Sequence, residues 1–193
     1  PLTAITNTKL LTAHKNNEVT DGSNSNHTIT KINNATHHVS NPFPGNTVGY
    51  GSLYFDGTDD FLTIASSSDF ALGTGDFTIE CWVNFSETSY EGGSNRRIFA
   101  LDDGGNAVDN LQIIIDEGSY STNGDLLLFT NSVLVNLNTD IRSAWHHIAL
   151  VRSSGTLKFY LDGVEKDSSS NTQNYSPNSG SPTPLIGTRG DTK

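Results

Sequence analysis

Six histidines are the residues of this chain best suited to metal binding or proton transfer, and two of them are adjacent. His146 and His147 stand in a β-rich run, where a histidine pair could suggest zinc binding or general base catalysis. Successive side chains of a strand point to opposite faces, so the two rings cannot easily chelate one ion. We therefore expect a packed or hydrogen-bonded pair. The others have no metal-ligand spacing and are expected to be exposed or hydrogen-bonded: His14, His27, His37 and His38.

Carboxylates are numerous, but their spacing does not provide the pair that glycoside hydrolysis requires. A retaining hydrolase needs two carboxyl groups about 5 Å apart on one face of a cleft. Glu80 stands alone in its strand-like run, whereas Asp116 and Glu117 are adjacent. Adjacent side chains diverge if the strand persists. The residues therefore argue against hydrolase activity.

The single cysteine, Cys81, excludes an intrachain disulfide. It lies inside an apolar strand-like run, which favours a small core residue over a nucleophile.

Charge narrows the range of partners. The formal net charge is −10, and both nucleic acids and anionic membranes require clustered Lys and Arg. We expect neither partner, and the acidity serves solubility or a cation site among the carboxylates.

No apolar run reaches the length of a membrane span, and the first residues do not resemble a signal peptide. The sequence starts at Pro1 and contains no Met, so we expect a processed chain or a piece of a longer one.

Turn chemistry dominates the composition. Asn, Ser and Thr form about a third of the chain, alongside 18 Gly, which is typical of short strands joined by turns. The clearest case is residues 145–166, where Ile148–Val151 and Leu157–Leu161 are separated by Ser153-Ser154-Gly155. Asp162-Gly163 then predicts a two-residue hairpin turn, because Gly tolerates positive φ. We expect a β-meander.

The elements that must position these residues are further short strands. Residues 76–85 form the longest predicted strand, with Ile79, Cys81, Val83 and Phe85 facing the core and Thr78, Glu80, Trp82 and Asn84 facing outward. Other strands are predicted at 10–14, 27–32, 53–55, 61–64, 97–101, 111–115, 125–130, 133–137 and 184–187, and a long surface loop at 167–184. The fold class that follows is all-β, an antiparallel β-sandwich or jelly roll.

Four ordered motifs resemble the laminin-G-like, concanavalin A-like jelly-roll superfamily: SLYFDGTDDFLTI, DFTIECWV, WHHIALVRSSGTLKFYLDGV and PLIGTRGD. The resemblance implies a domain over residues 48–193, to which an Asn-rich segment, 1–47, adds strands. Relatives usually continue with a closing strand that is absent before Lys193. Three explanations are open for the absent closing strand: its residues were not captured, a neighbouring subunit supplies it, or the last strand is assigned wrongly. We favour the first explanation.

The same resemblance bears on candidate sites. Laminarinase-like members carry a Glu-x-Asp-x-x-Glu motif that is absent here. The more distant resemblance to pentraxins implies a calcium site at Asp109, Asn110 and Asp191, although Arg189 stands where an acidic ligand is expected. No cofactor is required, and calcium is the one ion to test. The pentraxin pattern also implies that Cys81 packs against Ala149 without a bridge.

The style of the first half, with LLTAHKNNEVTDGSNSNHTIT followed by NPFPG, resembles structural proteins of tailed bacteriophages. This implies a non-enzymatic virion module, in a tail fibre, appendage or capsid decoration, on the virion surface. Its partners would be other virion proteins, copies of itself and host-surface carbohydrate. Tyr90, Tyr120 and Tyr175 are candidate glycan or partner contacts, because they lie in loop-like segments. The alternatives are a calcium-dependent lectin-like domain of a secreted or cell-surface protein and, less favoured, a glycoside hydrolase.

Overall fold

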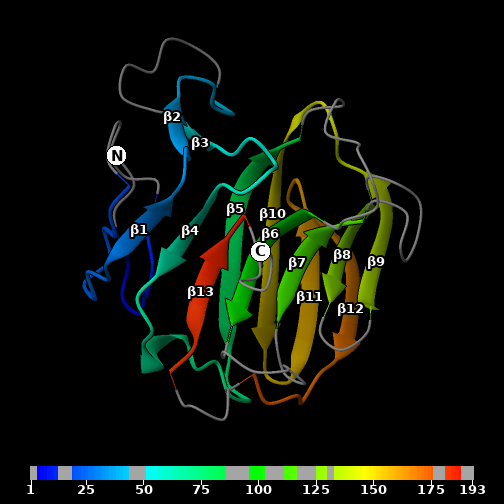
Figure 1. Cartoon of the computed structure of the whole chain (residues 1–193). Coiled ribbons are helices and arrows are strands. Elements are labelled where there is room, and N and C mark those ends of the chain that lie inside the picture. The colour runs from blue at the N-terminus through cyan, green and yellow to red at the C-terminus, as the bar shows by residue number, and fades with distance from the viewer. Residues whose placement is uncertain are drawn as a thin grey trace.

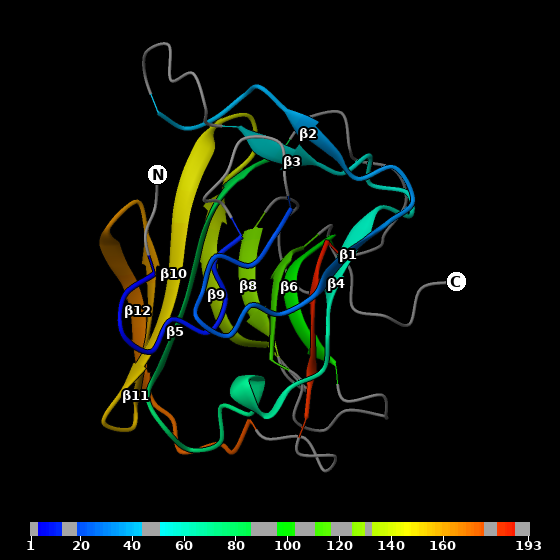
Figure 2. The same cartoon turned by 90° about the vertical axis from the view of Figure 1, so that its left-hand side faces the viewer.

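The chain folds into antiparallel β-sheets with one short 3-10 turn, η1 (Ser68–Phe70). The computed structural model describes residues 4–12, 19–43, 51–85, 96–102, 111–116, 125–129, 133–175 and 181–187. Two sheets stack face to face, with β10, β11 and β12 in one layer and β1, β4 and β6 in the other (Figure 2). The predicted all-β antiparallel sandwich is confirmed.

The larger layer is a seven-stranded sheet in the order β1-β4-β13-β6-β7-β8-β9 (Figure 1). Its β8–β9 pairing confirms the hairpin predicted from residues 125–137. The last strand in the chain, β13, lies inside this sheet between β4 and β6. The strands are β1 (Ile29–Ile32), β4 (Phe61–Ile64), β13 (Thr183–Ile186), β6 (Arg96–Asp102), β7 (Gln112–Ile115), β8 (Asp125–Phe129) and β9 (Val133–Asp140).

The smaller layer is a four-stranded sheet in the order β12-β11-β10-β5, built largely from the predicted meander. Its strands are β5 (Phe77–Asn84), β10 (Trp145–Ser153), β11 (Thr156–Leu161) and β12 (Val164–Ser170). Asp162 and Gly163 both have positive φ, at 52° and 78°, which confirms the predicted hairpin turn between β11 and β12. Within the described residues, β5 pairs as a strand with β10 alone, so it forms an edge of this sheet.

A two-stranded sheet, β2 (Thr36–His38) with β3 (Ser52–Tyr54), lies beyond one end of the sandwich (Figures 1 and 2). Since β1 pairs with β4, the N-terminal segment contributes a strand to the larger layer. The division at residue 47 stays a prediction.

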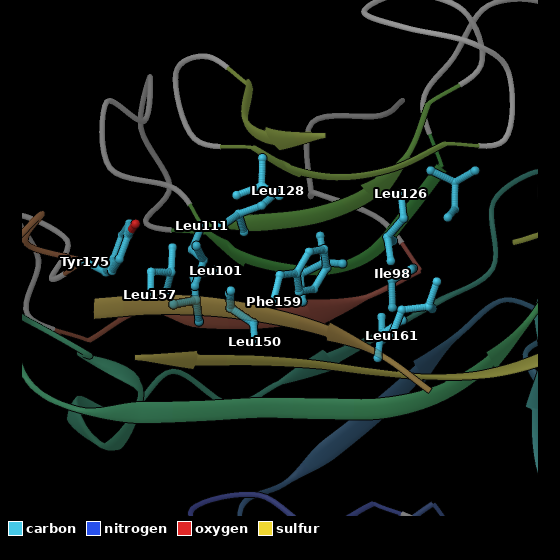
Figure 3. Packing of buried hydrophobic residues seen from close by; sticks show 14 of the residues in the cluster. Ile98, Leu101, Leu111, Leu126, Leu128, Leu150, Leu157, Phe159, Leu161 and Tyr175 are labelled. Atoms are coloured by element: carbon cyan, nitrogen blue, oxygen red, sulfur yellow. The ribbon is translucent and has the colours of Figure 1, made fainter. Parts of the chain in front are cut away.

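The core lies between the two layers. Leu150, Leu157, Phe159 and Leu161 of the smaller sheet point toward Ile98, Leu101, Leu111, Leu126 and Leu128 on the opposite side (Figure 3). All of these side chains are at most 7 % exposed. The predicted alternation of β5 is confirmed, because Ile79, Cys81, Val83 and Phe85 pack against this cluster while the alternate residues are exposed. The pleat therefore directs Trp82 and Glu80 to the outer face of the sheet.

Two element predictions differ from the structure. Residues 10–12 of the predicted strand 10–14 belong to no strand, because the Leu11 N–H bonds the Asp21 carboxylate. The predicted surface loop 167–184 is also wrong in part. β12 continues to Ser170, and Tyr175 is buried.

Candidate functional site

The outer face of the four-stranded sheet brings aromatic and polar side chains together. In the β5–β10 register, Asn84 lies opposite Trp145, Trp82 opposite His147, and Glu80 opposite Ala149. Directly opposed residues of an antiparallel pair project from the same face with their side chains in contact distance. Because this face points away from the core, these pairs form a surface.

Trp82 is the largest exposed side chain of this surface, with 44 % of its area accessible. Its indole lies edge-on to the Phe43 ring, with centroids 5.8 Å apart and planes at 66°. The centroid of the His147 ring lies 5.2 Å from that of the Trp82 ring, and the two planes are tilted by 51°. Packed aromatic neighbours hold an exposed ring in a defined orientation, so Trp82 presents a pre-set flat apolar face.

The segment after β2 completes the surface from a distant part of the sequence. The Trp145 Nε1–H donates to Ser40 Oγ over 3.3 Å, and Phe43 is itself 44 % exposed. These contacts bring residues 40–43 against the ends of β5 and β10. We name Ser40, Phe43, Glu80, Trp82, Trp145 and His147 the Trp82 surface.

Polar groups flank the rings. The Glu80 side chain is 63 % exposed, and its Oε2 lies 3.5 Å from His147 Nε2. On the opposite side of β10, His146 Nδ1 lies 2.7 Å from Asp162 Oδ2, and the His147 backbone N–H donates to Asp162 Oδ1. Burial alone would raise the pKa of Asp162, but these hydrogen bonds lower it below its ordinary value. Asp162 thus stays ionised and fixes the strand that carries His147.

Four of the five histidines that the structure describes match the sequence prediction. His146 and His147 face opposite sides and engage different carboxylates, as expected. His37 and His38 are exposed on β2, also as expected. His27 differs, because its ring packs on Phe70 with centroids 4.6 Å apart, and its buried Nε2 lies 3.3 Å from Asp69 Oδ2 without forming a hydrogen bond. His14 lies outside the described residues.

Tyr175 is not an exposed contact residue, which corrects the sequence prediction. It is 1 % exposed, and its ring packs edge-on to Phe77 while the Arg152 guanidinium lies 4.9 Å from its centroid. Its hydroxyl accepts a hydrogen bond from Asn171 Nδ2. The remaining candidates lie outside the described residues: Tyr90, Tyr120, Asp109, Asn110 and Asp191.

The pairing predicted for Cys81 is wrong by one residue. Cys81 lies opposite Ile148, whereas Ala149 lies opposite Glu80 on the outer face. Opposed positions share a face, so Cys81 and Ala149 point to opposite sides of the sheet. Burial, with a smaller contribution from Glu80, raises the pKa of the Cys81 thiol to about 12. Cys81 is partly buried against the core, and its raised pKa disfavours the thiolate, in agreement with the expectation that it is not a nucleophile.

Two groups of carboxylates could suggest other chemistry. Asp116 and Asp125 flank the β7–β8 pairing, joined by an Asp116 N–H to Asp125 carbonyl hydrogen bond, but they are only 0 % and 5 % exposed. A second group gathers Asp56, Asp59 and Asp60 at the β3–β4 turn. Asp60 there accepts hydrogen bonds from the backbone N–H groups of Asn34 and Asp56. These bonds give that cluster a role in shaping the turn.

Comparison with known families decides the assignment of the fold. The family model described as "Concanavalin A-like lectin/glucanases superfamily" matches residues 56–193, which is more than half of the chain. The chain belongs to this superfamily. No protein with a curated description matches the sequence. Among the described residues, no helix of this concanavalin A-like domain has the length and apolar character needed to cross a membrane.

Solved structures share the fold of this concanavalin A-like domain at low sequence identity. The binding domain of botulinum neurotoxin serotype D matches with a TM-score of 0.64 and 12 % identity, over 94 % of this chain and 43 % of the toxin chain. The binding domain of Paraclostridial Mosquitocidal Protein 1 gives 0.61 and 14 %, over 94 % and 48 %. The domain thus spans less than half the length of these toxin binding domains.

A third structure matches over most of both chains. Domain 4 of AbnA, a GH43 extracellular arabinanase from Geobacillus stearothermophilus solved with arabinotriose, has a TM-score of 0.62 and 16 % identity. The match covers 93 % of this concanavalin A-like domain and 84 % of that chain. At such identities the likeness shows the fold alone.

Sequence reasoning placed Trp82 and Glu80 on the outer face but did not select them as a site. The signal available was a large aromatic residue at an outward position of a strand. Phe43 carried no such signal, because the prolines on either side of it indicated only a break between elements.

Proposed function

We propose that this concanavalin A-like domain is a non-enzymatic carbohydrate-binding module, and that the sugar lies on the Trp82 surface. The observation that carries the proposal is an exposed, oriented indole with a carboxylate and an imidazole beside it. A sugar ring has an apolar C–H face and a rim of hydroxyls. It therefore matches a flat apolar ring flanked by hydrogen-bonding groups.

The comparisons support this class of ligand. The arabinanase domain of the same fold was solved with arabinotriose, and the toxin structures are described as binding domains. A non-enzymatic role is supported by the carboxylates, because the Asp116 and Asp125 side chains are buried. A hydrolase would need two carboxyl groups open to a bound glycan.

The biological setting that we propose is the surface of a tailed-bacteriophage virion. The order and style of the sequence motifs support it. There the domain would attach the particle to host-surface carbohydrate while contacting other virion proteins and copies of itself. Whether it belongs to a tail fibre, an appendage or a capsid decoration is decided by imaging the native particle.

The test begins with a screen of neutral oligosaccharides, arabinotriose among them, followed by calorimetry on the best ligand. Trp82→Ala removes the stacking face, and we expect it to weaken binding by roughly tenfold or more. Tyr54→Ala is the matched control, because Tyr54 is 54 % exposed but lies on β3. Equal affinity of Trp82→Ala and the wild-type protein would contradict the proposed site.

A chelator separates the proposal from its alternative. The Trp82 surface contains no cluster of three cation ligands among the described residues, so we expect binding to persist in EDTA. Loss of binding in EDTA, restored by calcium, would instead favour the calcium-dependent lectin.

A further inference from the structure

The net charge of the described residues around the Trp82 surface is negative, because the Lys158–Glu165 and Arg142–Asp140 pairs each balance and Glu80 remains. β5 contains no Lys or Arg, and Arg152 of β10 faces inward with 1 % exposure. Lys158 of β11 forms an ion pair with Glu165, with 2.9 Å between Nζ and Oε2. Glu80 is therefore the one charged residue of β5, and on the same outer face the charge of Lys158 is balanced by that of Glu165.

The segments nearest in sequence add no net positive charge, because Arg142, which precedes β10, forms an ion pair with Asp140. Residues 86–95 follow β5 and contain Glu87 and Glu91 but no Lys or Arg, and residues 44–50 follow Phe43 and contain no charged residue. The whole chain carries a formal charge of −10. A carboxylated ligand approaching Trp82 would meet repulsion at short range and at long range.

The register leaves the Glu80 carboxylate accessible to a ligand. Ala149 lies opposite Glu80, and Tyr160 lies opposite Ala149 on β11. Only a methyl group thus projects between the Glu80 carboxylate and the Tyr160 ring. Glu80 is two residues from Trp82 on the same face of β5, a separation of about 7 Å. A sugar ring stacked on Trp82 would therefore place hydroxyls within reach of the carboxylate.

We propose that Glu80 determines ligand specificity, so that the Trp82 surface accepts uncharged sugars and rejects sugars that bear a carboxylate. The inference rests on the proposed function. An ionised carboxylate accepts hydrogen bonds from sugar hydroxyls, but it can only repel a uronate or sialate group. Discrimination thus comes from a repulsive element as well as an attractive one.

The experiment compares one oligosaccharide in two forms, neutral and with its terminal C6 oxidised to a carboxylate, at about 0.15 M salt. We expect the wild-type protein to bind the neutral form roughly threefold to tenfold more tightly, and Glu80→Gln to remove most of that difference. Asp76→Asn is the matched control, because Asp76 is exposed, precedes β5 and loses the same charge. Asp76 lies about 13 Å from Glu80 along the strand, which is longer than the screening length of about 8 Å at this salt concentration. The preference for the neutral oligosaccharide should therefore survive in Asp76→Asn.

Two results would overturn the inference while leaving the proposed function standing. They are equal binding of both forms by the wild-type protein, and an unchanged preference in Glu80→Gln, provided that Trp82→Ala still weakens binding. Failure of the wild-type protein to bind either form would overturn the proposed function itself, and the inference with it.

Discussion

At the scale of single residues, Arg152 shows how a buried charge can organise its surroundings. Its guanidinium donates hydrogen bonds to the carbonyl oxygens of Gly73, Gly75 and Gln173 at 2.6–2.7 Å. It also lies 4.8 Å from the Phe77 ring centroid. Burial lowers the pKa of Arg152 below its ordinary value, against the attraction of Tyr175 and Asp76. A group that ionises so readily stays charged, so the residue ties two loops to the end of β10.

Arg152→Met keeps the aliphatic stem but leaves several buried carbonyl oxygens without donors. We expect it to lower the free energy of unfolding by about 3 kcal/mol, measured by denaturant titration. Arg142→Met is the control, because Arg142 pairs with Asp140 at the surface, where such pairs contribute about 0–1 kcal/mol. Equal losses in the two variants would contradict the role given to Arg152.

The burial of Tyr175 could not be predicted from the residues around it in the sequence. Its Asn- and Ser-rich neighbours are typical of a surface loop. The partners that bury it, Arg152 and Phe77, come from β10 and the start of β5. No local pattern encodes a contact across that sequence separation.

At the scale of elements, the buried carboxylate of Asp21 joins separate parts of the N-terminal segment by hydrogen bonds. Asp21 is 5 % exposed and accepts hydrogen bonds from the backbone N–H groups of Leu11, Ser23 and His27 at 2.8–3.0 Å. The Ser23 hydroxyl donates another. Burial raises the pKa of Asp21, but the hydrogen bonds together lower it below the ordinary value of 3.8. Asp21 therefore connects Leu11, Ser23 and His27 by side-chain hydrogen bonds, in a part of the chain where no strand pairing joins them.

A lowered native pKa makes the contribution of Asp21 dependent on pH. Its stabilisation is fully present above the unfolded value of 3.8 and is lost as pH falls below that value, through the native pKa. We expect Asp21→Asn to lower the free energy of unfolding by about 1–3 kcal/mol at pH 7. It should also flatten the decline of stability in acid, followed by denaturant titration at several pH values. Glu165→Gln, which removes an exposed carboxylate, should do much less. An unchanged acid profile in Asp21→Asn would contradict this account.

Element prediction succeeded where turn chemistry and alternation were local. Asp162-Gly163 specified a hairpin, and the alternation of residues 77–84 specified which side chains face inward. Register depends instead on pairing between strands, and an error of one residue moves a side chain to the other face. That is how Ala149, predicted beside Cys81, came to lie beside Glu80.

At the scale of the whole molecule, the sandwich class followed from composition and motif order, but the Trp82 surface did not. Its parts come from the segment after β2 and from β5 and β10, which meet only in the folded chain. The outward position of Trp82 was predictable, whereas its packing against Phe43 required the arrangement of the two-stranded sheet at the end of the sandwich. The candidate site is therefore a property of the tertiary fold.

Among the described residues, one side of β5 pairs with no other strand, and this has a consequence for the behaviour of the purified protein. Its eight residues contain no Pro, Lys or Arg, the features that commonly prevent one sheet edge from pairing with another. We expect reversible self-association that increases with protein concentration, detectable by light scattering. Thr78→Lys should suppress it, whereas Thr74→Lys, in the exposed loop before β5, should not. Equal scattering by the two variants would contradict this view.

Such association would not depend on redox conditions. Since the pKa of Cys81 is about 12, little thiolate exists at neutral pH to form a disulfide between molecules. Adding a reductant should leave the scattering unchanged, whereas dilution should reverse it. The shelf life of concentrated samples would thus depend on one strand edge rather than on oxidation.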